Sequence, residues 1–149
     1  MTSRLSPAAR AAIESSRDEA VRRGDRRIGT DHLLLGILHD TDIATLTGVD
    51  VLTARTHAHD LDRRALAAIG ITAPEIDPMS RAHKSKHMPL SSGVRAVIPR
   101  ALAMATARKA RQATTIDLLD ALLERKQPDP AAVLLNDLHI KPGSFHANQ

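Results

Sequence analysis

The tetrapeptide G-T-D-H at positions 29–32 places a hydroxyl, a carboxylate and an imidazole immediately before the apolar run at 33–38. These three groups have two possible roles, because such side chains can either cap the start of a helix or bind a ligand. Thr30 is suited to the N-cap of a helix that begins here. Asp31 in the first turn would interact favourably with the positive helix end, by about 0.3–1 kcal/mol. Helix initiation therefore explains both residues without a ligand.

Other reactive side chains do not form a recognisable catalytic or metal-binding pattern. His83 and His87 are four residues apart, but Pro89 and the polar surroundings favour an exposed basic linker over a metal-binding helix. The absence of cysteine excludes disulfides, thiolate catalysis and cysteine-ligated zinc. Neither a G-x-x-x-x-G-K-[ST] phosphate loop nor an H-E-x-x-H or G-x-S-x-G motif occurs. We expect no catalytic residue, no metal and no cofactor.

Composition favours an all-α domain. The 149 residues are 42% hydrophobic, and Phe145 is the single aromatic residue. The core must therefore consist of Leu, Ile, Val and Ala, a composition typical of closely packed helices. The first ten residues contain no apolar leader, and no apolar run approaches the roughly 18 residues of a membrane span. We expect a cytoplasmic protein without a membrane segment.

The charge balance is mildly basic. Twenty-one Lys and Arg stand against seventeen Asp and Glu, a net charge of +4. Solvated helix faces account for most of this charge, and the stacking aromatics of single-strand binders are missing. Nucleic acid is therefore not the expected partner. A small basic helical protein that binds nucleic acid or regulates another protein is the alternative function.

An internal repeat organises the chain. The segment LSPAARAAIESSRDEAVRRGDRRIGTDHLLLGIL from Leu5 aligns without a gap with LSSGVRAVIPRALAMATARKARQATTIDLLDALL from Leu90. This self-similarity predicts two copies of one supersecondary unit. We assign residues 1–70 to the first repeat, 71–89 to a linker and 90–149 to a second repeat with a truncated last helix. Together they are expected to form one compact domain.

Each repeat is predicted to be helical. The first helix starts at Ser6-Pro7, and Gly24 ends it. Thr30 caps a buried central helix, and a long fourth helix stops at Gly70. The inward-facing positions, which recur every three or four residues, are Ala9, Ala12, Ile13, Ser16 and Ala20 in the first helix and Val51, Ala54, Ala58, Leu61, Ala65 and Ala68 in the fourth.

The second repeat follows the same plan with three differences. Ser91 and Thr115 are its predicted caps, Asp129-Pro130 opens a helix through Leu138, and Pro99 should bend the helix that contains it. The segment 40–48 is shorter than its counterpart, 126–139, so we expect only a turn of helix there. The second repeat also lacks a long fourth helix. This predicts an uncovered apolar face that binds a partner or a second copy of the chain.

Two tandem copies of L-S-x-x-x-R-x-x-I, the first followed by G-T-D-H-L-L-L-G-I-L, resemble the Clp N-terminal domain of the ClpA and ClpC unfoldases. The second copy reads A-T-T-I-D-L-L-D-A-L-L at that point. The resemblance spans about residues 4–140. It implies a pseudo-twofold bundle of two four-helix repeats, with about seven to eight helices in this chain. It also implies a module without chemistry of its own, whose partners are client proteins, adaptors or Clp subunits.

The same resemblance implies candidate ligands. ClpC of this family reads phosphorylated arginine, and actinobacterial relatives bind antibacterial cyclic peptides on the same face. By analogy, Asp31 would pair with the guanidinium, and the helix N-terminus at Ser6 would donate to the phosphate. Ile116 stands where the second repeat should have the acid, which predicts at most one phosphoarginine-type site, in the first repeat. The candidate ligand-binding residues are Ser6, Arg10, Thr30, Asp31, Ser91 and Arg95.

Overall fold

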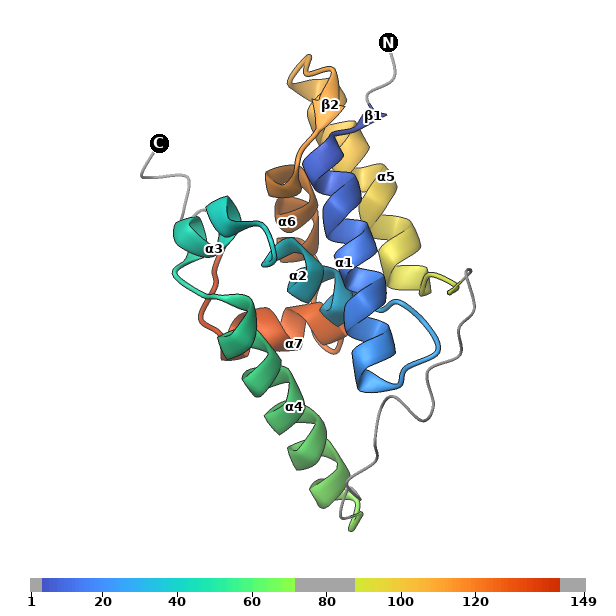
Figure 1. Cartoon of the computed structure of the whole chain (residues 1–149), viewed down its shortest axis with the longest axis vertical. Coiled ribbons are helices and arrows are strands. Elements are labelled where there is room, and N and C mark those ends of the chain that lie inside the picture. The colour runs from blue at the N-terminus through green and yellow to red at the C-terminus, as the bar shows by residue number, and fades with distance from the viewer. Residues whose placement is uncertain (1–3, 72–87, 143–149) are drawn as a thin grey trace.

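The computed structural model describes residues 4–71 and 88–142, and this part of the chain is all-α apart from one pair of two-residue strands (Figure 1). The predicted fold class is therefore confirmed. None of the described helices is sufficiently long and apolar to cross a membrane. In chain order the elements are β1 (Arg4–Leu5), α1 (Pro7–Arg23), α2 (Thr30–Ile37), α3 (Thr41–Thr47), α4 (Val51–Ala68), α5 (Ser92–Ala107), β2 (Gln112–Ala113), α6 (Thr115–Leu123) and α7 (Pro130–Asp137).

The core is built around the central helices α2 and α6. Leu34 and Leu119, the equivalent residues of the two repeats, are both fully buried, as predicted. Gly36 allows α1 to approach α2 very closely, because a Cβ at this position would lie 2.3 Å from the carbonyl oxygen of Ala12. The core therefore depends on aliphatic packing and on small residues where helices cross.

The helix ends confirm some predicted caps and correct others. The hydroxyls of Ser6 and Ser91 accept hydrogen bonds from the third residue of α1 and α5, and Gly24 ends α1 with a left-handed conformation. The predicted caps Thr30 and Thr115 are wrong by one residue. The N-caps of α2 and α6 are Gly29 and Thr114. The hydroxyls of Thr30 and Thr115 instead donate to Asp129 and Asp40, the N-caps of α7 and α3.

Short parallel pairings link each repeat to the other. Leu5 pairs with Ala113 in the β1–β2 ladder, and Leu90 pairs with Ile28 in an isolated bridge. These two pairings are related by the repeat, since Leu5 aligns with Leu90 and Ile28 with Ala113. The segment before the first helix of one repeat thus lies beside the segment before the central helix of the other. This exchange is what a pseudo-twofold arrangement requires.

The prediction of a single turn in place of α3 is wrong. This helix has seven residues, nearly as many as the eight of α7. Both helices are capped by an aspartate, Asp40 for α3 and Asp129 for α7, each of which accepts backbone hydrogen bonds. The length difference between the repeats lies in the longer connection that precedes α7. The first repeat therefore keeps its third helix although the connection before it is shorter.

Exposed apolar side chains occur elsewhere than predicted. Among the described residues, the exposed large apolar side chains are Leu52, Ile69 and Ile71, which are 66%, 70% and 47% accessible. All three belong to α4 or follow it, and the described part of the second repeat contributes none. The predicted uncovered face of the second repeat is therefore not found. Most of the 71–89 linker, including His83 and His87, lies outside the described residues, whereas Pro99 lies within α5 as expected.

Candidate binding site

The N-termini of α2, α5 and α7 meet in what we call the first junction. The Thr30 hydroxyl donates to Asp129 Oδ1 at 2.7 Å and accepts from the backbone N–H of Ala131 at 3.2 Å. Ser91 donates its backbone N–H to the carbonyl of Ile28 at 2.9 Å, so the start of α5 lies beside the start of α2. Gly93 is buried there, and a Cβ would lie 2.8 Å from the methyl group of Thr30.

The second junction repeats this arrangement at α1, α6 and α3. The Thr115 hydroxyl donates to Asp40 Oδ2 at 3.0 Å, as Thr30 does to Asp129 in the first junction. Ser6 donates its backbone N–H to the carbonyl of Ala113 at 2.9 Å. In both junctions a carboxylate of the chain itself therefore lies among the helix N-termini, which favour negative charge.

The structure separates some of the predicted site residues and brings others together. Ser6 and Arg10 lie at the start of α1, whereas Asp31 contacts Arg23 at its end. A helix of 17 residues is about 25 Å long, so Ser6 and Asp31 cannot hold one small ligand. The predicted single site near Ser6, Arg10, Thr30 and Asp31 is therefore wrong as a grouping. The structure instead places Thr30 next to Ser91, with Arg95 exposed one turn further along α5.

Asp31 already has a guanidinium partner within the chain. Arg23 Nη1 lies 2.7 Å from Asp31 Oδ2, and the same guanidinium contacts Asp62 on α4. Burial opposes the charge of Arg23, but Asp31, Asp62 and Asp25 outweigh burial and raise the pKa of the guanidinium. Sequence reasoning missed Arg23. The repeat contained a signal for it, because Arg23 aligns with Arg108, which pairs with Asp117 near the start of α6.

The imidazole of the opening tetrapeptide holds the start of α2. The N–H of Gly29 donates to His32 Nδ1 at 2.8 Å, and His32 Nε2 lies 2.7 Å from Asp25 Oδ2. Burial raises the pKa of Asp25, but the hydrogen bond from His32 and the charge of Arg23 outweigh it and lower that pKa. His32 is thus used for capping and leaves no ring nitrogen for a ligand.

A second buried acid also serves the fold. The Glu19 side chain is 1% accessible and accepts from Arg55 Nε at 2.6 Å, with His39 Nε2 at 3.2 Å. These contacts connect α1 with α4 and with His39, which lies just after α2. A buried carboxylate that pairs with an arginine and also contacts an imidazole has its polar atoms satisfied within the chain, which is the arrangement of a structural group.

Two surface depressions are open to solvent. One, of about 330 Å³, lies between α1 and the segment before α5 and has an apolar lining that includes Ile13, Ile28, Met88, Pro89 and Leu90. The other, of about 420 Å³, is a groove between α4 and α7. Depressions of this size accommodate a few side chains of a peptide.

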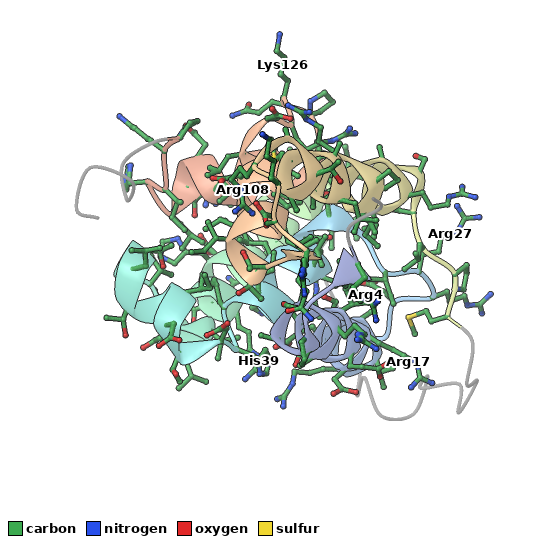
Figure 2. The ribbon with its side chains drawn as sticks, turned by 90° about the horizontal axis from the view of Figure 1, so that it is seen from above. Arg4, Arg17, Arg27, His39, Arg108 and Lys126 are labelled. Atoms are coloured by element: carbon green, nitrogen blue, oxygen red, sulfur yellow. The ribbon has the colours of Figure 1, made fainter. Side chains whose placement is uncertain are left out.

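The polar groups of the described chain do not suggest a metal site or a basic stripe. No three His, Asp or Glu side chains come together as a metal site within residues 4–71 and 88–142. Figure 2 shows Lys126 projecting from one side of the molecule and Arg17 and Arg27 from another, with Arg4 nearer the middle of the view. These labelled cations therefore do not line up along one face.

Comparison with solved structures identifies the fold. The N-terminal domain of the caseinolytic protease associated chaperone ClpD from Arabidopsis thaliana is similar, with a TM-score of 0.69, 22% sequence identity, and 91% of this chain and 87% of that chain covered. A structure from preliminary investigations of a malarial protein secretion system matches with a TM-score of 0.66 at 13% identity, covering 97% and 91%. No protein-family model and no curated protein sequence matches. The chain thus has the fold of a Clp N-terminal domain.

Proposed function

We propose that this chain, which has the Clp N-terminal fold, is a non-catalytic docking domain of the Clp type that binds segments of client or adaptor proteins. The likeness to the N-terminal domain of ClpD, a protease-associated chaperone, carries this proposal. It extends over 91% of this chain and 87% of that chain, so the proposal rests on the fold of the domain and not on a shared motif. Clp subunits are further candidate partners.

The distribution of polar and apolar groups supports docking over chemistry. The buried ionisable side chains Glu19 and Asp117 are each paired with an arginine of the chain. The two open depressions have mainly apolar linings, one formed by α1 and the segments before α2 and α5 and the other by α4 and α7. Such surfaces bind peptides through shape and apolar contact. The depression beside α1 is the place we propose for a cyclic peptide, since it combines the apolar side chains of Ile13, Ile28 and Leu90 with the charged Glu14 and Arg17.

Recognition of phosphorylated arginine is a narrower form of this proposal. The site we propose for it is formed by Thr30, which lies beside Ser91, and the adjacent Asp31, with Arg95 one turn further along α5. A ligand guanidinium must displace Arg23 from Asp31, which costs the existing ion pair and weakens binding. Titration calorimetry with free phosphoarginine should therefore give one weak site or no heat. If a site is present, Asp31→Asn should abolish the heat, and an unchanged isotherm would exclude Asp31 from the site.

Fluorescence anisotropy with labelled casein, an unfolded protein, tests the main proposal. We expect saturable binding that changes little between about 50 mM and about 200 mM salt, since apolar contact dominates. The binding of a DNA duplex that carries the same dye is measured for comparison. Tight DNA binding that weakens by orders of magnitude over this salt range would instead support the nucleic-acid alternative. Absence of casein binding together with such DNA binding would overturn the docking role.

A further inference from the structure

The groove between α4 and α7 arises because α4 leaves the body of the domain. Its first half is anchored by Ala54 and Ala58, which are buried, while the second half extends past α7 into solvent (Figure 1). The two helices diverge and leave about 420 Å³ between them. The apolar lining consists of Ala58, Leu61 and Ala65 from α4 and Pro130, Val133 and Leu134 from α7.

One end of the groove carries more negative than positive charge. Asp31 and Asp62 line it there and share the single guanidinium of Arg23, which also lies 3.7 Å from Asp25. Asp62 is 55% accessible, so its carboxylate can accept a further cation from solvent. Asp25 is held mainly by His32, so Asp31 and Asp62 share one guanidinium, which leaves a negative local potential.

The side of the groove near Arg64 has the same imbalance. Arg64 lines the groove and pairs with Asp60 at 3.1 Å and with Asp137 at 3.3 Å. Asp60 is also 55% accessible. Arg63 lies on the same helix but does not line the groove. The charged side chains that line the groove are Asp31, Asp62 and Arg64, and their ion-pair partners are Arg23, Asp60 and Asp137, the last of which also contacts His57. Four carboxylates therefore face two guanidiniums here, although the chain as a whole has a net charge of +4.

We infer that the groove binds a short peptide segment of a partner protein with two or three aliphatic side chains next to a lysine or arginine. The aliphatic groups fill the apolar lining, and the cation meets the partly neutralised carboxylates at the rim. This inference rests on the proposed docking function and names the class of segment. A second copy fits less well, because the exposed apolar segment formed by the end of α4 and the residues just after it, 65–71, contains no cation.

Two labelled nonapeptides test the charge preference. They share three leucines, and they carry three lysines or three glutamates at the same positions. Fluorescence anisotropy should show saturable binding of the lysine peptide and at least about tenfold weaker binding of the glutamate peptide, a difference of about 1.4 kcal/mol. Equal binding of the two peptides would overturn the inference.

Ala65→Arg tests the location, since it places a long cation in the groove. The matched control is Ala103→Arg on α5, which makes the same change at another exposed helical alanine. Ala65→Arg should weaken binding of the lysine peptide at least about tenfold and Ala103→Arg less than about twofold. Equal losses would show binding to the general surface. Circular dichroism melts of both variants confirm that they fold.

The outcomes separate this inference from the proposed function. If casein binds but the lysine peptide does not, docking stands and the assignment of this groove fails. If neither binds, the proposed function fails. If the protein forms a dimer by light scattering and Ala65→Arg dissociates it, a second copy occupies the groove and the inference is overturned.

Discussion

Gly36→Ala provides a sharp test of the packing of α1 on α2, because two effects of opposite sign compete. Alanine is favoured over glycine inside a helix by about 1 kcal/mol. The new Cβ, however, would lie 2.3 Å from the carbonyl oxygen of Ala12 and from Ser16 Oγ, and 2.7 Å from Ser16 N. Two of these three atoms belong to the backbone, so no side-chain rotation relieves the clash. The Ser16 hydroxyl also donates to the carbonyl of Ala12 at 2.7 Å and would lose this bond on moving.

We therefore expect steric strain to outweigh helix propensity. Overpacking costs typically about 1–3 kcal/mol, and the upper end applies here because backbone must shift. After subtraction of the propensity gain, Gly36→Ala should destabilise the protein by about 2 kcal/mol and lower its Tm by about 4–8 °C. Urea denaturation followed by circular dichroism at 222 nm measures this free energy of unfolding.

The second repeat supplies the control. Ala121 is the residue of α6 that aligns with Gly36, and it is buried. Ala121→Gly should cost about 1 kcal/mol through helix propensity, with a further small term for the lost methyl group. If Gly36→Ala instead raises stability by about 1 kcal/mol, propensity alone governs this position. The close approach of α1 to α2 would then be refuted.

Three further predictions concern stability. Thr30→Val keeps the side-chain shape but removes the hydroxyl that bonds to Asp129 and to the N-terminus of α7. It should lower the free energy of unfolding in urea by about 1–3 kcal/mol, and an unchanged midpoint would show that these bonds contribute nothing. Leu34→Ala should cost about 2–5 kcal/mol through lost burial and a cavity, and a loss below about 1 kcal/mol would mean that the site collapses freely. The hydrogen bond from His57 lowers the pKa of Asp137, and Arg64 adds to this shift. The ionised carboxylate of Asp137 therefore stabilises the folded protein above its unfolded pKa, and this contribution is lost as pH falls below about 4. Asp137→Asn should flatten the decline in stability below about pH 4, and an unaltered decline would assign it to other carboxylates.

The sequence by itself determined the features that depend on short-range interactions. Serine hydroxyls at Ser6 and Ser91 satisfy backbone donors three residues away, and a glycine at position 24 tolerates the left-handed turn that ends α1. Apolar spacing of three and four residues predicted the buried face of α1 and the buried Ala54 and Ala58 of α4. The same spacing was wrong for Ala65 and Ala68, which are exposed because the second half of α4 extends away from the core. The repeat then made the all-α, pseudo-twofold fold predictable, because equivalent segments must find equivalent partners. Even there, the caps of α2 and α6 were misplaced by one residue, since the sequence does not show which hydroxyl another helix will engage.

The tertiary structure alone decided which residues share a site. Thr30 bonds to Asp129, 99 positions away, and Arg23 on α1 meets Asp62 on α4, 39 positions away. No local spacing encodes such pairs, so sequence reasoning grouped Ser6 with Asp31 although α1 separates them by its whole length. It also left Asp31 available to a ligand, when the end of α1 supplies a guanidinium. Helix propensity and capping act over one turn, whereas the placement of helix ends depends on how rigid helices pack, and that is settled only when the whole core forms.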